Sequence, residues 1–293
     1  MNSLTKEDKL LYERSSGWLN RAYRWLSKSG LTLSRLDLML LANPSAKIKG
    51  ISDIVKIADN RFELDDSSFW RAKDLLSWRF DSLLDETEFV VTDLESTGAV
   101  LGKDEIFEIG AIKMRGGEMI EEFHTYVKIN QSIPPYVASM TRADLSAIAK
   151  APNIKEVLKK FLEFLGVAVL VAHNAEFDYN FIYYETQRHG LKTLPVIDLC
   201  TWLLAKQVLD KEKKYGLTDL AKFHKGDLAD RHSALGDARM TGYLLKYLIS
   251  QMKKKNTNHL SQMLALENKS FNQAYKARPK IKRNKQKLTA QNV

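Results

Sequence analysis

Residues 89–98 read FVVTDLESTG and combine an apolar run with two closely spaced acids. The apolar run, Phe89-Val90-Val91, is typical of a buried central strand. Asp93 and Glu95 follow two residues apart, and the period of a strand points both side chains to the same side of the sheet. Two crowded carboxylates cost energy unless a cation lies between them. The pair therefore indicates either a metal site or two ordinary surface acids, and the apolar strand before it favours the metal site.

Two longer β-rich runs follow, IFEIGAIKM at 106–114 and IEEFHTYVKI at 120–129. Between them, residues 115–118 read RGGE and predict a hairpin, with both glycines where a positive φ is needed. Apolar runs at 168–172 and 195–199 predict two more buried strands. The strands together predict a mixed sheet that contains one antiparallel hairpin.

Helical patterns lie between and after these strands. Asn153 is expected to cap a helix that ends at Gly166, whereas Pro134-Pro135 predicts an extended loop. Further helices are predicted in the segment that stops at Gly190 and around 199–210, 217–224 and 234–252. This order of elements predicts an α/β fold in which helices pack on a mixed sheet.

A third acid, Asp178, follows the apolar run at 169–172 in the segment LVAHNAEFDYNF. It is expected in the first turn of a helix just after a strand, and open α/β sheets place their sites at the carboxyl ends of strands. A structural explanation is equally available, because the helix macrodipole favours an acid in the first turn. His173 and Asn174 likewise serve either the site or the backbone groups of their loop.

His232 and Asp237 lie five residues apart in DRHSALGDARMT. Within one helix that spacing would separate them by roughly 140°, so they converge only if His232 lies in the loop before the helix. Ser233 is suited to cap that helix, which would place Asp237 in its first turns. The alternative for His232 is an exposed loop histidine with no catalytic role.

The charge of the chain is concentrated at its C-terminal end. Residues 251–293 contain eleven Lys or Arg and one acid, Glu267, so this segment carries +10 whereas the first 250 residues carry −1. We expect residues 253–293 to form a flexible basic tail, which is either simply solvated or a phosphate-binding arm. No run of 18 or more apolar residues predicts a membrane span. Cys200 is the single cysteine, which fits a reducing, cytoplasmic location.

Residues 1–86 are predicted to form a helical region. A capping box at 5–8 begins the first helix, a third helix is expected at 46–59, and a fourth is expected to begin after Asp65-Asp66-Ser67-Ser68. Four of the five tryptophans lie in this region, where they indicate the core of a small bundle rather than a ligand site. The chain is thus expected to divide into this region, a central α/β domain at 87–252 and the basic tail.

Taken together, DLESTG, HNAEFDYNF and HSALGDA resemble the three motifs of the DEDDh 3′–5′ exonucleases, a family that includes the proofreading epsilon subunit of bacterial DNA polymerase III. The resemblance covers about residues 88–250 and includes EIGAI, IDL and GLTDLAKF between the motifs. The subtype follows from Asp237, because Ser233 stands where the tyrosine subtype has its tyrosine, and His232 precedes it. The resemblance implies a ribonuclease H-like sheet, which agrees with the predicted strand order.

The resemblance also implies a role for each matching residue. Asp93, Glu95, Asp178 and Asp237 would hold two divalent cations, Mg²⁺ or Mn²⁺, and His232 would be the general base. The residues expected to contact the substrate are Ser96, Thr97, Gly98, His173, Asn174 and Phe177. The sequence departs from the family at Arg142, which stands where a loop near the substrate base commonly has a glycine.

The implied activity is stepwise hydrolysis of nucleic acid from a single-stranded or 3′-terminal end, with release of nucleoside 5′-monophosphates and with DNA preferred. An RNA-trimming exoribonuclease is one alternative, because the same residues serve both substrates. A nucleic-acid-binding scaffold with an accessory exonuclease domain is another. A polymerase or a sliding clamp is a possible partner, and the stretch QMLAL at 262–266 loosely resembles a clamp-binding peptide, although an amphipathic helix end explains it as well. No membrane partner is expected.

Overall fold

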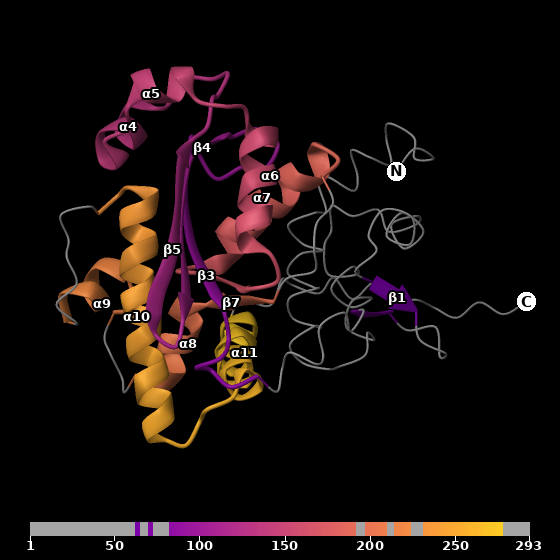
Figure 1. Ribbon diagram of the computed structural model, residues 1–293, viewed down its shortest axis with the longest axis vertical. Coiled ribbons are helices and arrows are strands. Elements are labelled where there is room, and N and C mark those ends of the chain that lie inside the picture. The colour runs from indigo at the N-terminus through magenta and orange to yellow at the C-terminus, as the bar shows by residue number, and fades with distance from the viewer. Residues whose placement is uncertain are drawn as a thin grey trace, which may run out of the picture.

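The central feature of the structure is a five-stranded sheet with helices on both faces (Figure 1). It is seen in a computed structural model that describes residues 62–64, 70–72, 82–191, 197–209, 214–223 and 231–277. The strand order is β5-β4-β3-β6-β7. The strands are β3 (Phe89–Ser96), β4 (Ile106–Arg115), β5 (Glu118–Tyr126), β6 (Val169–Ala172) and β7 (Asp198–Cys200).

The middle strand of this sheet is β3, the strand that begins with Phe89-Val90-Val91. It pairs antiparallel with β4 and parallel with β6, and β6 pairs parallel with β7. Residues 116 and 117 connect β4 to β5, and their φ angles are +62° and +81°. Two successive positive φ angles define the turn that suits a two-residue hairpin, and glycine adopts them without strain. The mixed sheet and its glycine hairpin are therefore confirmed.

Helices cover the sheet on both sides. One face packs against α6 (Ile154–Leu165) and α7 (Ala175–Arg188). The opposite face packs against a larger group of helices (Figure 1). That group consists of α8 (Thr201–Val208), α9 (Leu217–Phe223), α10 (Ala234–Lys254) and α11 (Leu260–Ala277). None of the helices in the described part of the chain combines the length and the apolar character that a membrane span requires.

The alternation of β3 assigns its side chains to these two faces. Val90 packs in the core beneath α6 and α7, whereas Val91 packs in the core beneath α10. Because side chains alternate along a strand, Asp93 and Glu95 share the phase of Val91. Both acids therefore belong to the face that α10 covers.

The predicted ends of α6 are confirmed, but the segment before it differs from prediction. The Asn153 side chain accepts a hydrogen bond from the Glu156 amide at 3.1 Å, and Gly166 ends the helix with a φ of +53°. Pro135, expected in an extended loop, instead begins α4 (Pro135–Thr141), which α5 (Leu145–Lys150) follows. Proline is well suited to the first helical position because it lacks only an amide that would have no helical partner there. Arg142 ends α4 with a φ of +53°, the left-handed conformation that favours the glycine common in the family.

The helical prediction for residues 1–86 is wrong where the structure tests it. Residues 70–72, assigned to the fourth helix, form β2 (Trp70–Ala72), which pairs antiparallel with β1 (Phe62–Leu64). Residues 65–68, which are predicted to cap that helix, lie outside the described residues. The helices predicted at 5–8 and 46–59 lie outside the described residues.

The prediction of a flexible tail from residue 253 is wrong over much of its length. Residues 260–277 form α11, which packs against α8 and contributes Leu260, Met263 and Leu264 to the core. The carboxylate of Glu267, the only acid of that segment, is buried and accepts a hydrogen bond from the Cys200 amide at 2.9 Å. The backbone at residues 82–84 also pairs with residues 258–260. The body of the fold therefore extends beyond the predicted limits of 87 and 252.

Candidate active site

Two of the predicted metal ligands lie near the C-terminal end of β3. Asp93 is opposite Gly110 on β4, and Glu95 is opposite Glu108. The register then shifts between Glu95 and Ser96, where regular pairing with β4 ends. Such irregularities bend a strand and redirect its side chains, and they are common beside active sites.

The first turn of α10 rests directly on β4 at Gly110. A Cβ atom added to this glycine would lie 2.1 Å from the amide nitrogen of Leu235 and 2.2 Å from the carbonyl carbon of Ala234. No side chain fits in that space, so only glycine permits this contact between helix and sheet. This contact brings Asp237, in the first turn of α10, close to Asp93 on the middle strand β3.

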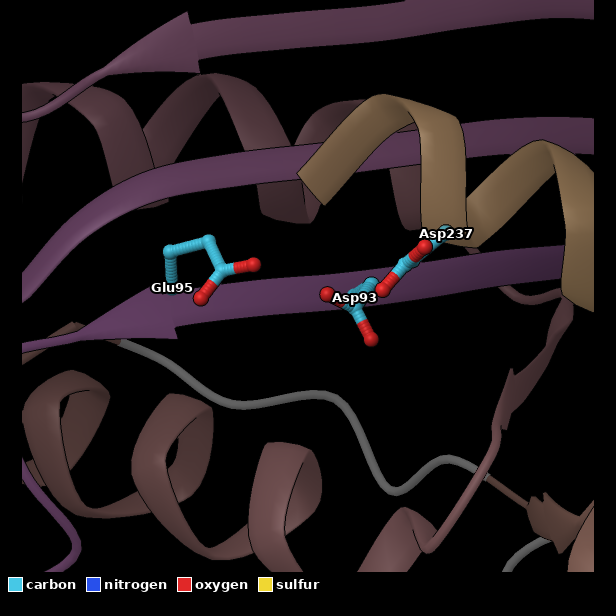
Figure 2. Close-up of side chains that lie close together, drawn as sticks. All are labelled: Asp93, Glu95 and Asp237. Atoms are coloured by element: carbon cyan, nitrogen blue, oxygen red, sulfur yellow. The ribbon is translucent and has the colours of Figure 1, made fainter. Parts of the chain in front are cut away.

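Three carboxylates from these two elements meet in one place (Figure 2). One oxygen from each of Asp93, Glu95 and Asp237 lies within 4.8 Å of the other two. Oxygen atoms of carboxylates are the ligands that Mg²⁺ and Mn²⁺ prefer in proteins. The donor set and its spacing therefore fit a divalent cation.

The fourth acid, Asp178, approaches from α7. It lies in the first turn of that helix and is 3% exposed, and the helix begins after Asn174, whose φ of +78° turns the chain at the end of β6. Its charge raises the pKa of both Asp93 and Glu95, although burial is the larger cause for each. Asp178 is therefore an electrostatic neighbour of the three clustered acids.

This pocket disfavours negative charge in the absence of a cation. Burial, followed by the charges of Asp178, Asp237 and Glu95, raises the pKa of Asp93 well above its ordinary value. Burial, followed by the charge of Glu108 and then of the other acids, raises the pKa of Glu95 to about 8. A bound divalent cation would reverse both effects because it favours the ionised carboxylates.

Arg231 brings a positive charge into the pocket. Its Nη1 atom forms an ion pair with Oδ2 of Asp237, and its Nη2 atom donates a hydrogen bond to Oγ1 of Thr218 at 2.7 Å. The guanidinium charge lowers the pKa of Asp93 and Glu95 and so partly offsets the effect of burial. Sequence reasoning missed this residue, although it lies next to His232 in the third motif.

His232 occupies the loop position that its spacing from Asp237 predicts. Its φ is +64°, it precedes the cap residue Ser233, and its amide lies 3.4 Å from Oδ1 of Asp237. The residue is partly buried, and its imidazole has no hydrogen-bond partner among the described residues. The structure therefore brings the backbone of His232 next to Asp237, and the general-base role of its ring stays a prediction.

The three residues after Glu95 form a braced turn. The Ser96 hydroxyl donates to the carbonyl of Gly98 at 2.6 Å. The buried Thr97 hydroxyl oxygen accepts hydrogen bonds from the Glu105 amide at 3.0 Å and from Nε2 of Gln131 at 2.7 Å. Both hydroxyls thus shape the turn itself, and the substrate contacts implied for this segment stay a prediction.

His173, Asn174 and Phe177 lie at the junction of β6 and α7. Nε2 of His173 donates to the Tyr215 carbonyl at 3.0 Å, and Nδ1 is 2.9 Å from the Thr201 hydroxyl. Burial lowers the pKa of His173 to about 4, so the ring is neutral and ties the end of β6 to its neighbours. Asn174 is exposed, and Phe177 packs against the ring of Phe181 with a centroid distance of 4.8 Å. The substrate contacts predicted for these three residues remain untested.

Glu108 is a further acid that sequence reasoning missed. It is 2% exposed on β4, opposite Glu95, and Oε1 lies 2.8 Å from Nε2 of His124 on β5. Its position two residues before Gly110 gives both residues the same strand phase. The alternation within EIGAI could therefore have placed Glu108 beside the predicted acids.

The structure does not support the clamp-binding interpretation of residues 262–266. Met263 and Leu264 are 0% and 2% exposed in α11, and Oε1 of Gln262 accepts the amides of Asn258 and His259 at 2.8 and 3.0 Å. A docking peptide must present its apolar side chains to the partner, whereas these belong to the core. The amphipathic helix end that explained the pattern equally well is the correct alternative.

Comparison with known proteins identifies the family of the chain. The family model described as Exonuclease, RNase_T, matches residues 90–245, which is more than half of the chain. The PolC-type DNA polymerase III of Caldanaerobacter subterraneus subsp. tengcongensis is 37% identical over 178 residues, covering 61% of this chain and 13% of that protein. The corresponding protein of Clostridium perfringens is 39% identical over 176 residues, covering 59% and 12%. The chain thus matches about an eighth of the length of these curated relatives.

The fold is shared with solved exonucleases. The crystal structure of E. coli exonuclease I in complex with a dT13 oligonucleotide has a TM-score of 0.52 at 14% identity, covering 58% of this chain and 43% of that chain. This likeness confirms the ribonuclease H-like sheet that the motifs implied. With the family matched over more than half of its length and the four acids and histidine of the motifs all present, the chain belongs to the exonuclease family, as a DEDDh-type 3′–5′ exonuclease.

Proposed function

We propose that this protein hydrolyses the 3′-terminal phosphodiester of DNA with two divalent cations, Mg²⁺ or Mn²⁺, and releases nucleoside 5′-monophosphates. The observation that carries the proposal is the convergence of oxygens from Asp93, Glu95 and Asp237 within 4.8 Å. Asp178, buried and electrostatically coupled to them, supplies the fourth carboxylate.

The four carboxylates would hold the cations. When bound, divalent cations polarise the phosphate and lower the pKa of an attacking water. The acids alone would repel a phosphodiester, so binding of the substrate also depends on the cations. The pKa of about 8 for Glu95 supports this requirement, because a pocket of that kind is stable in its ionised form only with added positive charge.

His232 would act as the general base. Its partly buried imidazole has no hydrogen-bond partner among the described residues, and its backbone is next to Asp237. An imidazole is the commonest general base in enzymes and can accept the proton of the attacking water. The braced turn at 96–98 would then present the terminal nucleotide, with Thr97 held by Gln131.

The preference for DNA rests on the relatives, which are DNA polymerases of the PolC type. Proofreading or repair of DNA 3′ ends is the corresponding role, and association with a polymerase is part of the same proposal. A cytoplasmic location is proposed with it, since a sequence with a single cysteine, Cys200, has no partner for a disulfide within itself and suits a reducing compartment.

Single-stranded DNA and RNA of equal length and sequence, each labelled at the 5′ end, would test the activity. Shortening from the 3′ end, abolished by EDTA and restored by Mg²⁺ or Mn²⁺, is the expected result, with DNA degraded faster. Asp93→Asn is expected to lower turnover by orders of magnitude, whereas Asp85→Asn, at an exposed acid paired with Lys253, should retain activity. Faster degradation of RNA would replace the DNA preference with an exoribonuclease function, and no shortening of either strand would reject the proposal.

A further inference from the structure

Arg231 is held at the acidic pocket by two different kinds of partner. Its Nη1 atom pairs with a carboxylate oxygen of Asp237, whereas its Nη2 atom donates to the neutral hydroxyl of Thr218 on α9 at 2.7 Å. The side chain is only 16% exposed. Its Nε atom is buried and has no hydrogen-bond partner among the described residues. Among the described residues, the guanidinium therefore forms one ion pair, with Asp237, and it has donor capacity that these residues do not use.

A divalent cation on Asp237 would remove that counter-ion. The carboxylate charge that now balances Arg231 would be shared with the cation, and the two positive charges would repel each other. A mostly buried guanidinium left without an anion is unfavourable, because burial removes the water that would otherwise stabilise its charge. Because Thr218 is neutral, it can hold the group in place without compensating its charge. Another anion must then enter the pocket to restore the balance.

The anion that reaches a nuclease site with the cations is a phosphate. Guanidinium groups bind phosphate oxygens through a planar fork of N–H donors, and Arg231 has both Nη1 and Nε available once Asp237 is engaged elsewhere. The neighbouring acids cannot take this role, since Asp93, Glu95 and Asp178 are the remaining proposed cation ligands. The phosphate of the terminal nucleotide therefore matches the unfilled donors in charge and geometry.

We propose that Arg231 is a substrate-positioning residue that exchanges Asp237 for a phosphate oxygen of the terminal nucleotide when divalent cations bind. Thr218 retains the guanidinium during this exchange. The proposal rests on the proposed exonuclease function and goes beyond it, because Arg231 and Thr218 are not among the four acids and the histidine. It also gives a purpose to the GLTDLAKF segment, which carries Thr218.

The exchange predicts opposite effects of Arg231→Gln on two ligands. Mn²⁺ binding to the nucleotide-free protein, measured by isothermal titration calorimetry, should become several-fold tighter because a competing cation has been removed from Asp237. Binding of thymidine 5′-monophosphate to the Mn²⁺-saturated protein should become roughly ten- to a hundredfold weaker, the usual effect of losing a charge-assisted hydrogen bond. Binding of thymidine, which lacks the phosphate, should not change.

Two further variants keep the test decisive. Arg231→Lys retains the charge but loses the fork, so it should bind thymidine 5′-monophosphate more tightly than Arg231→Gln and less tightly than the wild type. Arg239→Gln is the matched control, because Arg239 also lies near the start of α10 but pairs with Glu122 on β5, with both N–O distances 2.7 Å. Arg239→Gln should leave the affinities for Mn²⁺ and for thymidine 5′-monophosphate unchanged.

The outcomes separate this role from a structural one. If Arg231 only supported the fold, Arg231→Gln would weaken Mn²⁺ and nucleotide together, and that result would overturn the proposal. Unchanged binding of both ligands would overturn it as well. A wild-type protein with no metal-dependent shortening of DNA would instead reject the proposed function, so the two failures are distinguishable.

Discussion

Asp93 on β3 lies directly opposite Gly110 on β4, and Gly110 is the residue on which the first turn of α10 rests. The two residues are 17 positions apart in the chain, yet their pairing sets the distance between the sheet and the helix that carries Asp237. The absence of a side chain at one position therefore determines whether the carboxylates of Asp93 and Asp237 can share a cation.

Gly110→Ala is expected to damage the site and the fold together. Its Cβ would overlap the backbone of Leu235 and Ala234, so α10 must move away from β4. Overpacking of this kind typically costs about 1–3 kcal/mol of stability. Chemical denaturation should show that loss, and calorimetry should show weaker Mn²⁺ binding.

Gly216→Ala is a suitable control for this change. Among the residues that the structure describes, the added Cβ would meet only the Asp219 side chain, at 3.3 Å, and that side chain can move. Near-normal stability and Mn²⁺ binding are expected. If Gly110→Ala behaved in the same way, the contact between β4 and α10 would not govern the site.

The metal-free protein is expected to lose stability as the pH rises. The folded-state pKa of Glu95, about 8, lies above its ordinary value near 4.5, so the folded protein binds this proton more tightly than the unfolded chain does. The resulting stabilisation is complete below pH 4.5 and is lost progressively as the pH approaches 8. The raised pKa of Asp93 acts in the same direction.

Chemical denaturation in EDTA, repeated at several pH values between about 5 and 8, would measure how the free energy of unfolding changes with pH. Glu95→Gln should make the free energy of unfolding less dependent on pH. Glu118→Gln, at an exposed acid paired with Lys246, should leave this dependence unchanged. Saturating Mn²⁺ should also remove the loss of stability at higher pH, because bound cations favour the ionised acids. Stability that is constant or rises over this range in EDTA would contradict the acidic pocket.

His232→Ala is expected to lower kcat by about 10²–10⁴-fold, the usual contribution of a general base. The dependence of kcat on pH should also change, because a general base acts only in its deprotonated form. Mn²⁺ affinity should stay near the wild-type value because the imidazole is not one of the proposed ligands. His189→Gln, at the far end of α7, is the control, and a profile unchanged in His232→Ala would remove the histidine from this role.

Leu264→Ala tests whether α11 belongs to the folded body. Leu264 is 2% exposed in the core shared with α8 and α10, so its truncation should cost about 2–5 kcal/mol. Val167→Ala, at an apolar residue that is 52% exposed, should change stability by less than about 0.5 kcal/mol. A similarly small loss for Leu264→Ala would show that residues 260–277 behave as a tail.

Local signals in the sequence predicted much of the sheet and of the site. The alternation at 89–95 placed Asp93 and Glu95 on one side of a central strand, and the strand has that orientation. Ser233 predicted a helix start that leaves His232 in the loop, and its side chain does accept the Gly236 amide at 3.2 Å. These features are decided by the period of a strand and by hydrogen bonds between near neighbours, which a short segment already contains.

Other elements were misjudged where one signal concealed another. The lysines after residue 253 suggested a solvated tail, but Leu260, Met263 and Leu264 recur at helical spacing within it and are buried. Pro135 suggested a loop although proline also begins helices. The composition of a segment describes all its residues together. Burial depends on the few residues that pack against apolar side chains elsewhere in the fold.

The sequence by itself determined which residue types carry the chemistry, the strand and helix positions that hold them, and the family to which they belong. Two relationships required the tertiary structure: α10 approaches β4 at Gly110, and Arg231 pairs with both Asp237 and Thr218. The physical reason is distance along the chain. Local geometry is fixed by neighbours a few residues away, but the meeting of charges from β3, β4, α9 and α10 depends on how the whole sheet and its helices pack.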